Sequence, residues 1–131
     1  RLKYPQAGFL IFGDESKILP LVKKYPGLES VVEVRHTPDR VTSEDKPGIA
    51  LRQGRNSSMR LAIDAVGKGE AHCVVSAGNT GALMAMAKFV LKLMPGITRP
   101  AIATFLPTKV PGHGAVMLDL GANVECDPQN P

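Results

Sequence analysis

GFLIFGDESKILPLVKKYPGLESVVEV, residues 8–34, is the stretch that decides the predicted fold. Residues 8–13 form a short apolar run between two glycines, which is typical of a buried strand of the parallel kind. Residues 16–25 place apolar side chains at helical spacing and end in Pro26-Gly27, so they predict a helix. Residues 31–34 predict the next strand. A strand, a helix and a second strand in this order predict an α/β fold with a mostly parallel sheet.

The rest of the chain continues this alternation. Residues 35–54 are polar and contain prolines and glycines, which predicts a long loop with a short helix near residues 49–52. The remaining helices are expected at residues 59–66 and from about 81 to 94, and the remaining strands at residues 72–76, 101–106 and 115–120. We therefore expect a single α/β domain over residues 1–131, with a mostly parallel sheet flanked by helices.

Composition excludes several classes of protein. The 131 residues suit one globular domain, with 44% hydrophobic and 21% charged residues. Aromatic residues make up only 5%, and the lysines and arginines behind the net charge of +4 are scattered, so a nucleic-acid partner is not expected. Cys73 and Cys126 lack the spacing of a zinc site or a redox pair, which indicates a reducing cytoplasm.

Both ends of the chain suggest an internal fragment of a longer protein. The sequence starts at Arg1 without an initiator methionine and stops at Pro131 soon after a strand-and-turn pattern. We expect no secretory leader, and the apolar stretch at residues 81–94 is interrupted by lysines and too short to cross a bilayer.

The strongest local motif is Ser76-Ala77-Gly78-Asn79-Thr80-Gly81, between a predicted strand and a predicted helix. The first N–H groups of a helix have no acceptor within the helix, and glycines let a phosphate approach them closely. Ser76, Asn79 and Thr80 would add side-chain hydrogen bonds. The alternative is purely structural, with Gly78 and Gly81 permitting a tight turn and Asn79 or Thr80 capping the helix.

A second motif, Asp119-Leu120-Gly121-Ala122-Asn123, follows the last predicted strand. Ligands of open α/β sheets bind at the carboxyl ends of the strands, where this motif is expected. Asp119 either accepts hydrogen bonds from a neighbouring loop or takes part directly in chemistry.

The long loop and the segment before the next predicted helix carry three cations. Lys46, Arg52 and Arg55 would neutralise a phosphate or contact an acidic partner, or they form an ordinary solvated surface. Cys73 is expected in the core, and His113 is expected in a loop and not as a general base.

Several motifs together resemble, in order and spacing, the bacterial phosphate acyltransferase family. They are Glu44-Asp45-Lys46-Pro47, Asn56-Ser57-Ser58-Met59-Arg60, Ser76 to Met84, Pro95-Gly96-Ile97-Thr98-Arg99-Pro100 and Asp119 to Val124. The resemblance implies an enzyme that moves a long-chain acyl group from acyl carrier protein to inorganic phosphate in phospholipid synthesis. It also implies a fold like that of the isocitrate and isopropylmalate dehydrogenases, whose first strand and carboxy-terminal half this chain lacks.

The same resemblance implies a cytoplasmic homodimer that contacts an anionic membrane peripherally and passes its product to a downstream acyltransferase. No metal or redox cofactor is required. The rival interpretations are a non-catalytic anion- or nucleotide-binding module and a dehydrogenase of the related fold, which would need metal carboxylates and a nicotinamide site.

For this reaction we expect two groups of site residues. The candidate catalytic residues are Lys46, Asn79 and Asn123, the last as a donor to the acyl carbonyl. The candidate phosphate-binding residues share backbone amides, hydroxyls or charge near the predicted helix starts and strand ends, and are Arg52, Ser57, Ser76, Gly78, Thr80, Gly81 and Asp119.

Overall fold

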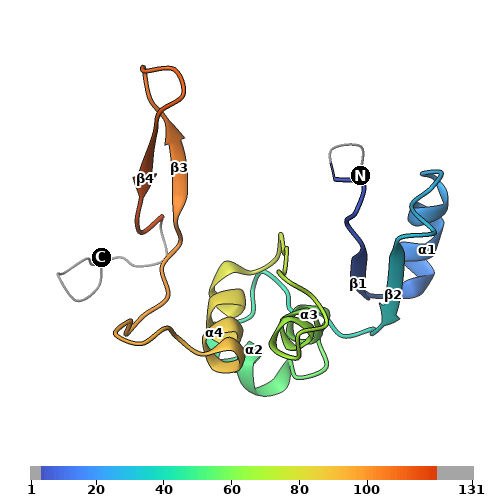
Figure 1. The fold of residues 1–131 in the computed structure, drawn as a ribbon. Coiled ribbons are helices and arrows are strands. Elements are labelled where there is room, and N and C mark those ends of the chain that lie inside the picture. The colour runs from blue at the N-terminus through green and yellow to red at the C-terminus, as the bar shows by residue number, and fades with distance from the viewer. Residues whose placement is uncertain (1–3, 121–131) are drawn as a thin grey trace. The chain divides into compact units, whose positions relative to one another are not determined.

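The computed structural model describes residues 4–120. The chain divides into two compact units between Leu91 and Lys92 (Figure 1). Among the described residues, the first unit contains two strands and four helices, and the second contains two strands.

The first unit begins with the predicted strand, helix and strand. β1 (Phe9–Gly13) and β2 (Val32–His36) pair in parallel, with Phe9 opposite Val32. α1 (Glu15–Lys23) connects them and packs against β2. Asp14 caps α1 by accepting a hydrogen bond from the amide of Ser16 at 3.1 Å, and the Ser16 hydroxyl holds the pKa of Asp14 below its usual value. The α/β class and the parallel pair are therefore confirmed.

Three helices form the core of this unit: α2 (Pro47–Gln53), α3 (Ser58–Gly67) and α4 (Thr80–Leu91). Their buried side chains make one apolar cluster, consisting of Ala50, Met59, Ile63, Ala82 and Met86. Both the short helix in the loop and the helix after it were predicted, near residues 49–52 and at residues 59–66.

α3 and α4 run in the same direction. A Cβ atom on Gly78, just before α4, would lie 3.0 Å from Cε of Met59 at the start of α3. A Cβ atom on Gly67, at the end of α3, would lie 3.1 Å from Cγ1 of Val90 near the end of α4. The amino-terminal ends of α3 and α4 therefore lie at the same end of the pair, where their helix dipoles are positive.

The strand predicted at residues 72–76 is wrong. These residues form no strand, and Val75 is 92% exposed. A strand needs a neighbour for its N–H and C=O groups, and β1 and β2, the described strands of the first unit, pair only with each other. Cys73 is exposed, so its predicted place in the core is also wrong.

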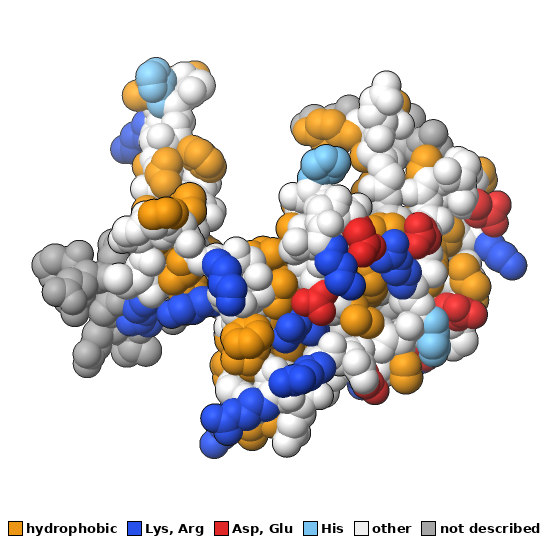
Figure 2. All heavy atoms as spheres, turned by 60° about the horizontal axis from the view of Figure 1, so that its bottom comes forward, with side chains coloured by type: hydrophobic (Ala, Val, Ile, Leu, Met, Phe, Trp, Pro, Cys, Tyr) orange, Lys and Arg blue, Asp and Glu red, His pale blue; other side chains and the backbone are white. Residues whose placement is uncertain are grey.

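The second unit contains a hairpin and not further parallel strands. β3 (Thr104–Pro107) and β4 (Gly114–Met117) pair in antiparallel fashion, with Thr104 opposite Met117. The expectation of a mostly parallel sheet is therefore wrong for these two strands, because the short connection between them permits only the antiparallel arrangement. Hydrophobic side chains stay exposed on the hairpin, and Figure 2 shows exposed hydrophobic side chains among scattered lysines and arginines on one face of the molecule.

α4 ends at Leu91, three residues before the expected end, where Lys92 has a positive φ of 68°. Within residues 4–120, no helix combines the length and the apolar character that crossing a bilayer requires.

Arg35, in β2, makes a side-chain contact with Glu70, which follows α3 in the sequence. Its guanidinium donates hydrogen bonds to Glu33 at 2.7 Å and to Glu70, and it lies 5.7 Å from the centre of the Phe12 ring. The hydrogen bond from Arg35 lowers the pKa of Glu70 below its ordinary value of 4.5.

Replacing Glu70 with glutamine is expected to cause a small loss of thermal stability at neutral pH. Because the folded-state pKa of Glu70 is lowered, its contribution is present above pH 4.5 and is lost as the pH falls through the folded value. Melting temperatures measured from pH 7 to pH 3 test this, with Glu29→Gln as a charge-matched control. A difference between Glu70→Gln and wild type that persists at the lowest pH would contradict the assignment.

Candidate functional site

The start of α4 carries the strongest predicted motif. Oδ1 of Asn79 accepts a hydrogen bond from the amide of Ala82 at 2.9 Å, so Asn79 is the N-cap of the helix. Within residues 4–120, no hydrogen-bond acceptor lies against the amides of Thr80 and Gly81. The first turn of α4 therefore presents two unbonded N–H groups at the positive end of the helix dipole.

The turn before the helix is held by Ser76. Its Oγ accepts a hydrogen bond from the amide of Gly78 at 3.2 Å, and both residues are exposed. The hydroxyl of Ser76 still has a hydrogen to donate to a ligand, since this bond uses it only as an acceptor.

The other end of the Asn79 amide reaches a distant loop. Nδ2 lies 3.1 Å from the carbonyl oxygen of Thr42, 3.3 Å from that of Ser43 and 2.9 Å from that of Asp45. The two N–H groups of one amide thus share three carbonyl oxygens from residues 42–45. This loop lies more than 30 positions earlier in the sequence, so Asn79 ties two separate segments together.

A second contact brings α2 against the same turn. A Cβ atom on Gly81 would lie 2.7 Å from Cγ of Pro47, which is closer than real Cβ atoms approach. Lys46 stands between the two contacts, because its neighbours are Asp45, bonded to Asn79, and Pro47, packed on Gly81. The backbone of Lys46 is therefore held beside the first turn of α4, while its side chain is exposed.

Replacing Gly81 with alanine is expected to destabilise the protein by about 1–3 kcal/mol, because the new methyl group overlaps the Pro47 ring. Gly48→Ala is the matched control within α2. A Cβ there meets nothing within 4 Å, so this variant is expected to be unchanged or up to about 1 kcal/mol more stable. Urea unfolding compares the two, and equal stability would refute the close contact between α2 and α4.

Lys46 has no ion-pair partner among the described residues. Its side chain also makes no capping hydrogen bond to α2. The ammonium group is therefore free to bind an anion. Arg52, the other predicted countercharge, is exposed in the last turn of α2, about 9 Å further along the helix axis.

Ser57 has a structural position. It is 1% exposed, its hydroxyl donates to the carbonyl of Gly54 at 2.6 Å, and it accepts from the amide of Arg60 at 3.3 Å as the N-cap of α3. Thr37, which no sequence motif marks, is also buried, and its hydroxyl donates a hydrogen bond to the carbonyl of Asn56, the residue before Ser57, at 2.7 Å. Together the two hydroxyls hold the start of α3 from within.

Asp119 belongs to the second unit, whereas the motif at residues 76–81 belongs to the first. Oδ1 of Asp119 accepts a hydrogen bond from the amide of Ile102 at 2.8 Å, which agrees with the structural alternative for this residue. Gly121 and Asn123 lie outside the described residues.

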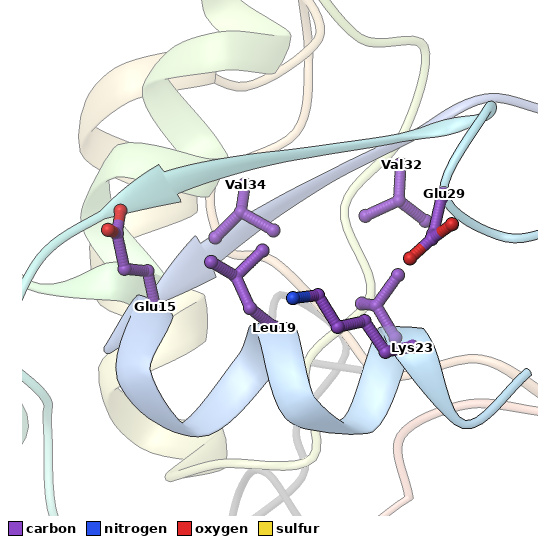
Figure 3. Close-up of a pocket in the computed structure, with 7 residues that line it drawn as sticks. Glu15, Leu19, Lys23, Glu29, Val32 and Val34 are labelled. Atoms are coloured by element: carbon purple, nitrogen blue, oxygen red, sulfur yellow. The ribbon is translucent and has the colours of Figure 1, made fainter.

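Two open hollows mark the surface of the first unit. The larger, about 380 Å³, lies between α1 and β2, and Figure 3 shows Leu19 of α1 facing Val34 of β2 across it, with Lys23 and Glu29 near its rim. None of the predicted site residues lines it. The smaller, about 300 Å³, lies beside the tied loop and is lined by Asp39, Arg40, Val41, Asp45, Ile49, Ala50, Gln53 and Gly54. Among residues 4–120, no three histidine, cysteine or carboxylate side chains are grouped to hold a metal ion.

Comparisons with known proteins identify similar sequences over nearly the whole chain. Residues 2–130 match a family described as fatty acid synthesis protein. The chain is 65% identical to the phosphate acyltransferase of Rhodospirillum centenum over 130 residues, which are 99% of this chain and 36% of that protein. It is 55% identical to the phosphate acyltransferase of Paramagnetospirillum magneticum, over 98% of this chain and 36% of that protein. It is also 55% identical to that of Rhodospirillum rubrum, over 99% and 37%. The chain thus spans little more than a third of the length of these relatives.

Proposed function

The chain belongs to the fatty acid synthesis protein family, and on that premise we propose that it is part of a phosphate acyltransferase of phospholipid synthesis. The reaction moves a long-chain acyl group from acyl carrier protein to inorganic phosphate. The observation that carries the proposal is the first turn of α4, where the unbonded amides of Thr80 and Gly81 lie beside the exposed Lys46. Such a start of a helix, next to a cation, suits a phosphate dianion.

In the proposed mechanism, an oxygen of phosphate attacks the carbonyl carbon of the acyl thioester. A C–O bond forms while negative charge gathers on the carbonyl oxygen, and the C–S bond then breaks to release the thiolate of the carrier. The amides of Thr80 and Gly81 hold the phosphate, Lys46 offsets its charge, and Ser76 donates its hydroxyl. Asn123 lies outside the described residues, and its role as a donor to the carbonyl oxygen is proposed from its sequence motif alone.

Of three predicted phosphate ligands, one stays in the proposed site, one is secondary and one is removed. Gly78 stays in the proposed site, because a residue without a side chain lets the backbone of the turn come close to a ligand. Arg52 is secondary to Lys46, because it lies at the far end of α2. Ser57 is left out of the proposed site, since its buried hydroxyl caps α3.

We also propose that residues 1–131 lie within one α/β domain of the dehydrogenase-like type, completed by strands outside this chain. The apolar segment at residues 72–76 supports this, because an exposed Val75 would be covered by a neighbouring strand. The proposal includes a cytoplasmic homodimer with peripheral contact to an anionic membrane and a downstream acyltransferase. These features rest on the resemblance to the family.

The test uses the full-length protein and a long-chain acyl thioester of acyl carrier protein. Free thiol is followed with and without phosphate, and acyl phosphate is trapped with hydroxylamine. Phosphate-dependent thiol release with trapped product is expected. Release without phosphate would indicate a thioesterase, and no release would indicate a module that binds anions without catalysis.

A further inference from the structure

We propose that Asn79 is a positioning residue with two separable roles: its Oδ1 caps α4, and its Nδ2 holds residues 42–45 so that Lys46 stays at the first turn of that helix. The inference rests on the proposed function for its effect on phosphate. It replaces the prediction that Asn79 acts on the substrate directly, because both ends of the amide already bond to the protein.

The side chain of Asn79 has no spare hydrogen-bonding group aimed at a ligand. Oδ1 is 2.9 Å from the amide of Ala82, and Nδ2 is within 3.3 Å of the three loop carbonyls. The side chain is only half-buried, whereas Thr80 beside it is exposed. A phosphate at this turn would therefore contact the backbone of Thr80 and Gly81 and not the amide of Asn79.

Besides Val41, which packs against the apolar core, and α2, which packs against α4, the loop is attached to the turn before α4 through Asn79. Within the loop, the carboxylate of Asp45 accepts from the amide of Thr42 at 2.7 Å, which shapes the turn but does not anchor it to α4. Thr42, Ser43 and Glu44 are exposed and supply no buried side chain. Apart from the Pro47 contact with Gly81, the described attachment of this loop to α4 runs through Nδ2 of Asn79.

Lys46 follows Asp45, whose carbonyl accepts the shortest of the three bonds, so releasing the loop moves the backbone of Lys46. The electrostatic attraction between the Lys46 ammonium group and a phosphate at the start of α4 weakens as the distance between them grows. The tether thus sets where the ammonium group stands before phosphate arrives.

Two variants separate the roles. Asn79→Ser keeps a capping oxygen, because serine is an equally good N-cap, but its side chain ends one bond short of Nδ2 and carries one hydrogen. Asn79→Ala removes both cap and tether. In the full-length protein, both are expected to raise KM for phosphate about tenfold with little change in kcat, whereas only Asn79→Ala lowers the melting temperature.

A double variant with Lys46 distinguishes a positioning role from a purely structural one, because only a positioning role makes the effect of Asn79→Ser on KM depend on Lys46. In a Lys46→Met background, Asn79→Ser is expected to leave KM for phosphate unchanged, because the group it positions is gone. Amide hydrogen exchange of residues 42–47 is expected to speed up in Asn79→Ser.

Three results would overturn the inference: an unchanged KM in Asn79→Ser, the same rise of KM with and without Lys46, or an unchanged exchange rate in the loop. If KM for phosphate rises only in Asn79→Ala, the variant whose melting temperature also falls, the effect belongs to the loss of the helix cap. If the wild-type protein shows no phosphate dependence, the proposed function fails, and hydrogen exchange still decides whether Asn79 holds the loop.

Discussion

Replacing Lys46 with methionine is expected to lower kcat/KM for phosphate roughly ten- to a hundredfold. A hydrogen bond to a charged group contributes about 1.5–3 kcal/mol, and this lysine directly precedes Pro47, which packs on Gly81 at the open amides of α4. The melting temperature is expected to stay unchanged, because the side chain is exposed and neither caps α2 nor forms an ion pair among the described residues.

Steady-state kinetics on the full-length protein, with phosphate varied at saturating thioester, provide the measurement. Lys24→Met is the matched control, since it removes one exposed positive charge at the end of α1 and should leave the kinetics unchanged. Lys46→Arg keeps the charge and should recover most of the activity. If Lys46→Met and Lys24→Met behave alike, the phosphate site is not beside α2.

Replacing Ile63 with alanine is expected to destabilise the protein by about 2–5 kcal/mol. Ile63 is fully buried in α3, within the cluster that joins this helix to α2 and α4. Removing three carbon atoms there leaves a cavity, because neighbours such as Met86 are themselves fully buried and can collapse only in part.

Thermal and urea unfolding measure this effect, with Ile49→Ala as the control. Ile49 also lies in a helix but is 48% exposed, so the same change should cost less than about 1 kcal/mol. Similar losses in the two variants would show that Ile63 is not at the centre of a packed core.

Local signals in the sequence predicted most of the helices and the first sheet correctly. The predicted helix ranges located α1, α2, α3 and α4 within a few residues. Two kinds of prediction failed. Residues 72–76 are as apolar as a strand but have no described partner, and the last two strands pair with each other as a hairpin.

The motif before α4 marks the division between what the sequence determines and what tertiary structure decides. The sequence alone indicated that Asn79 either caps the helix or binds phosphate, because an N-cap depends only on residues two or three positions apart. It did not indicate that Nδ2 would bond to the carbonyls of residues 42–45, or that Pro47 would rest on Gly81. Backbone carbonyls are present at every residue, so no side-chain pattern records which of them a distant amide will reach. The packing of α2 against α4, together with the hydrogen bonds from Nδ2 of Asn79, brings the two segments together and places the backbone of Lys46 at the start of the helix.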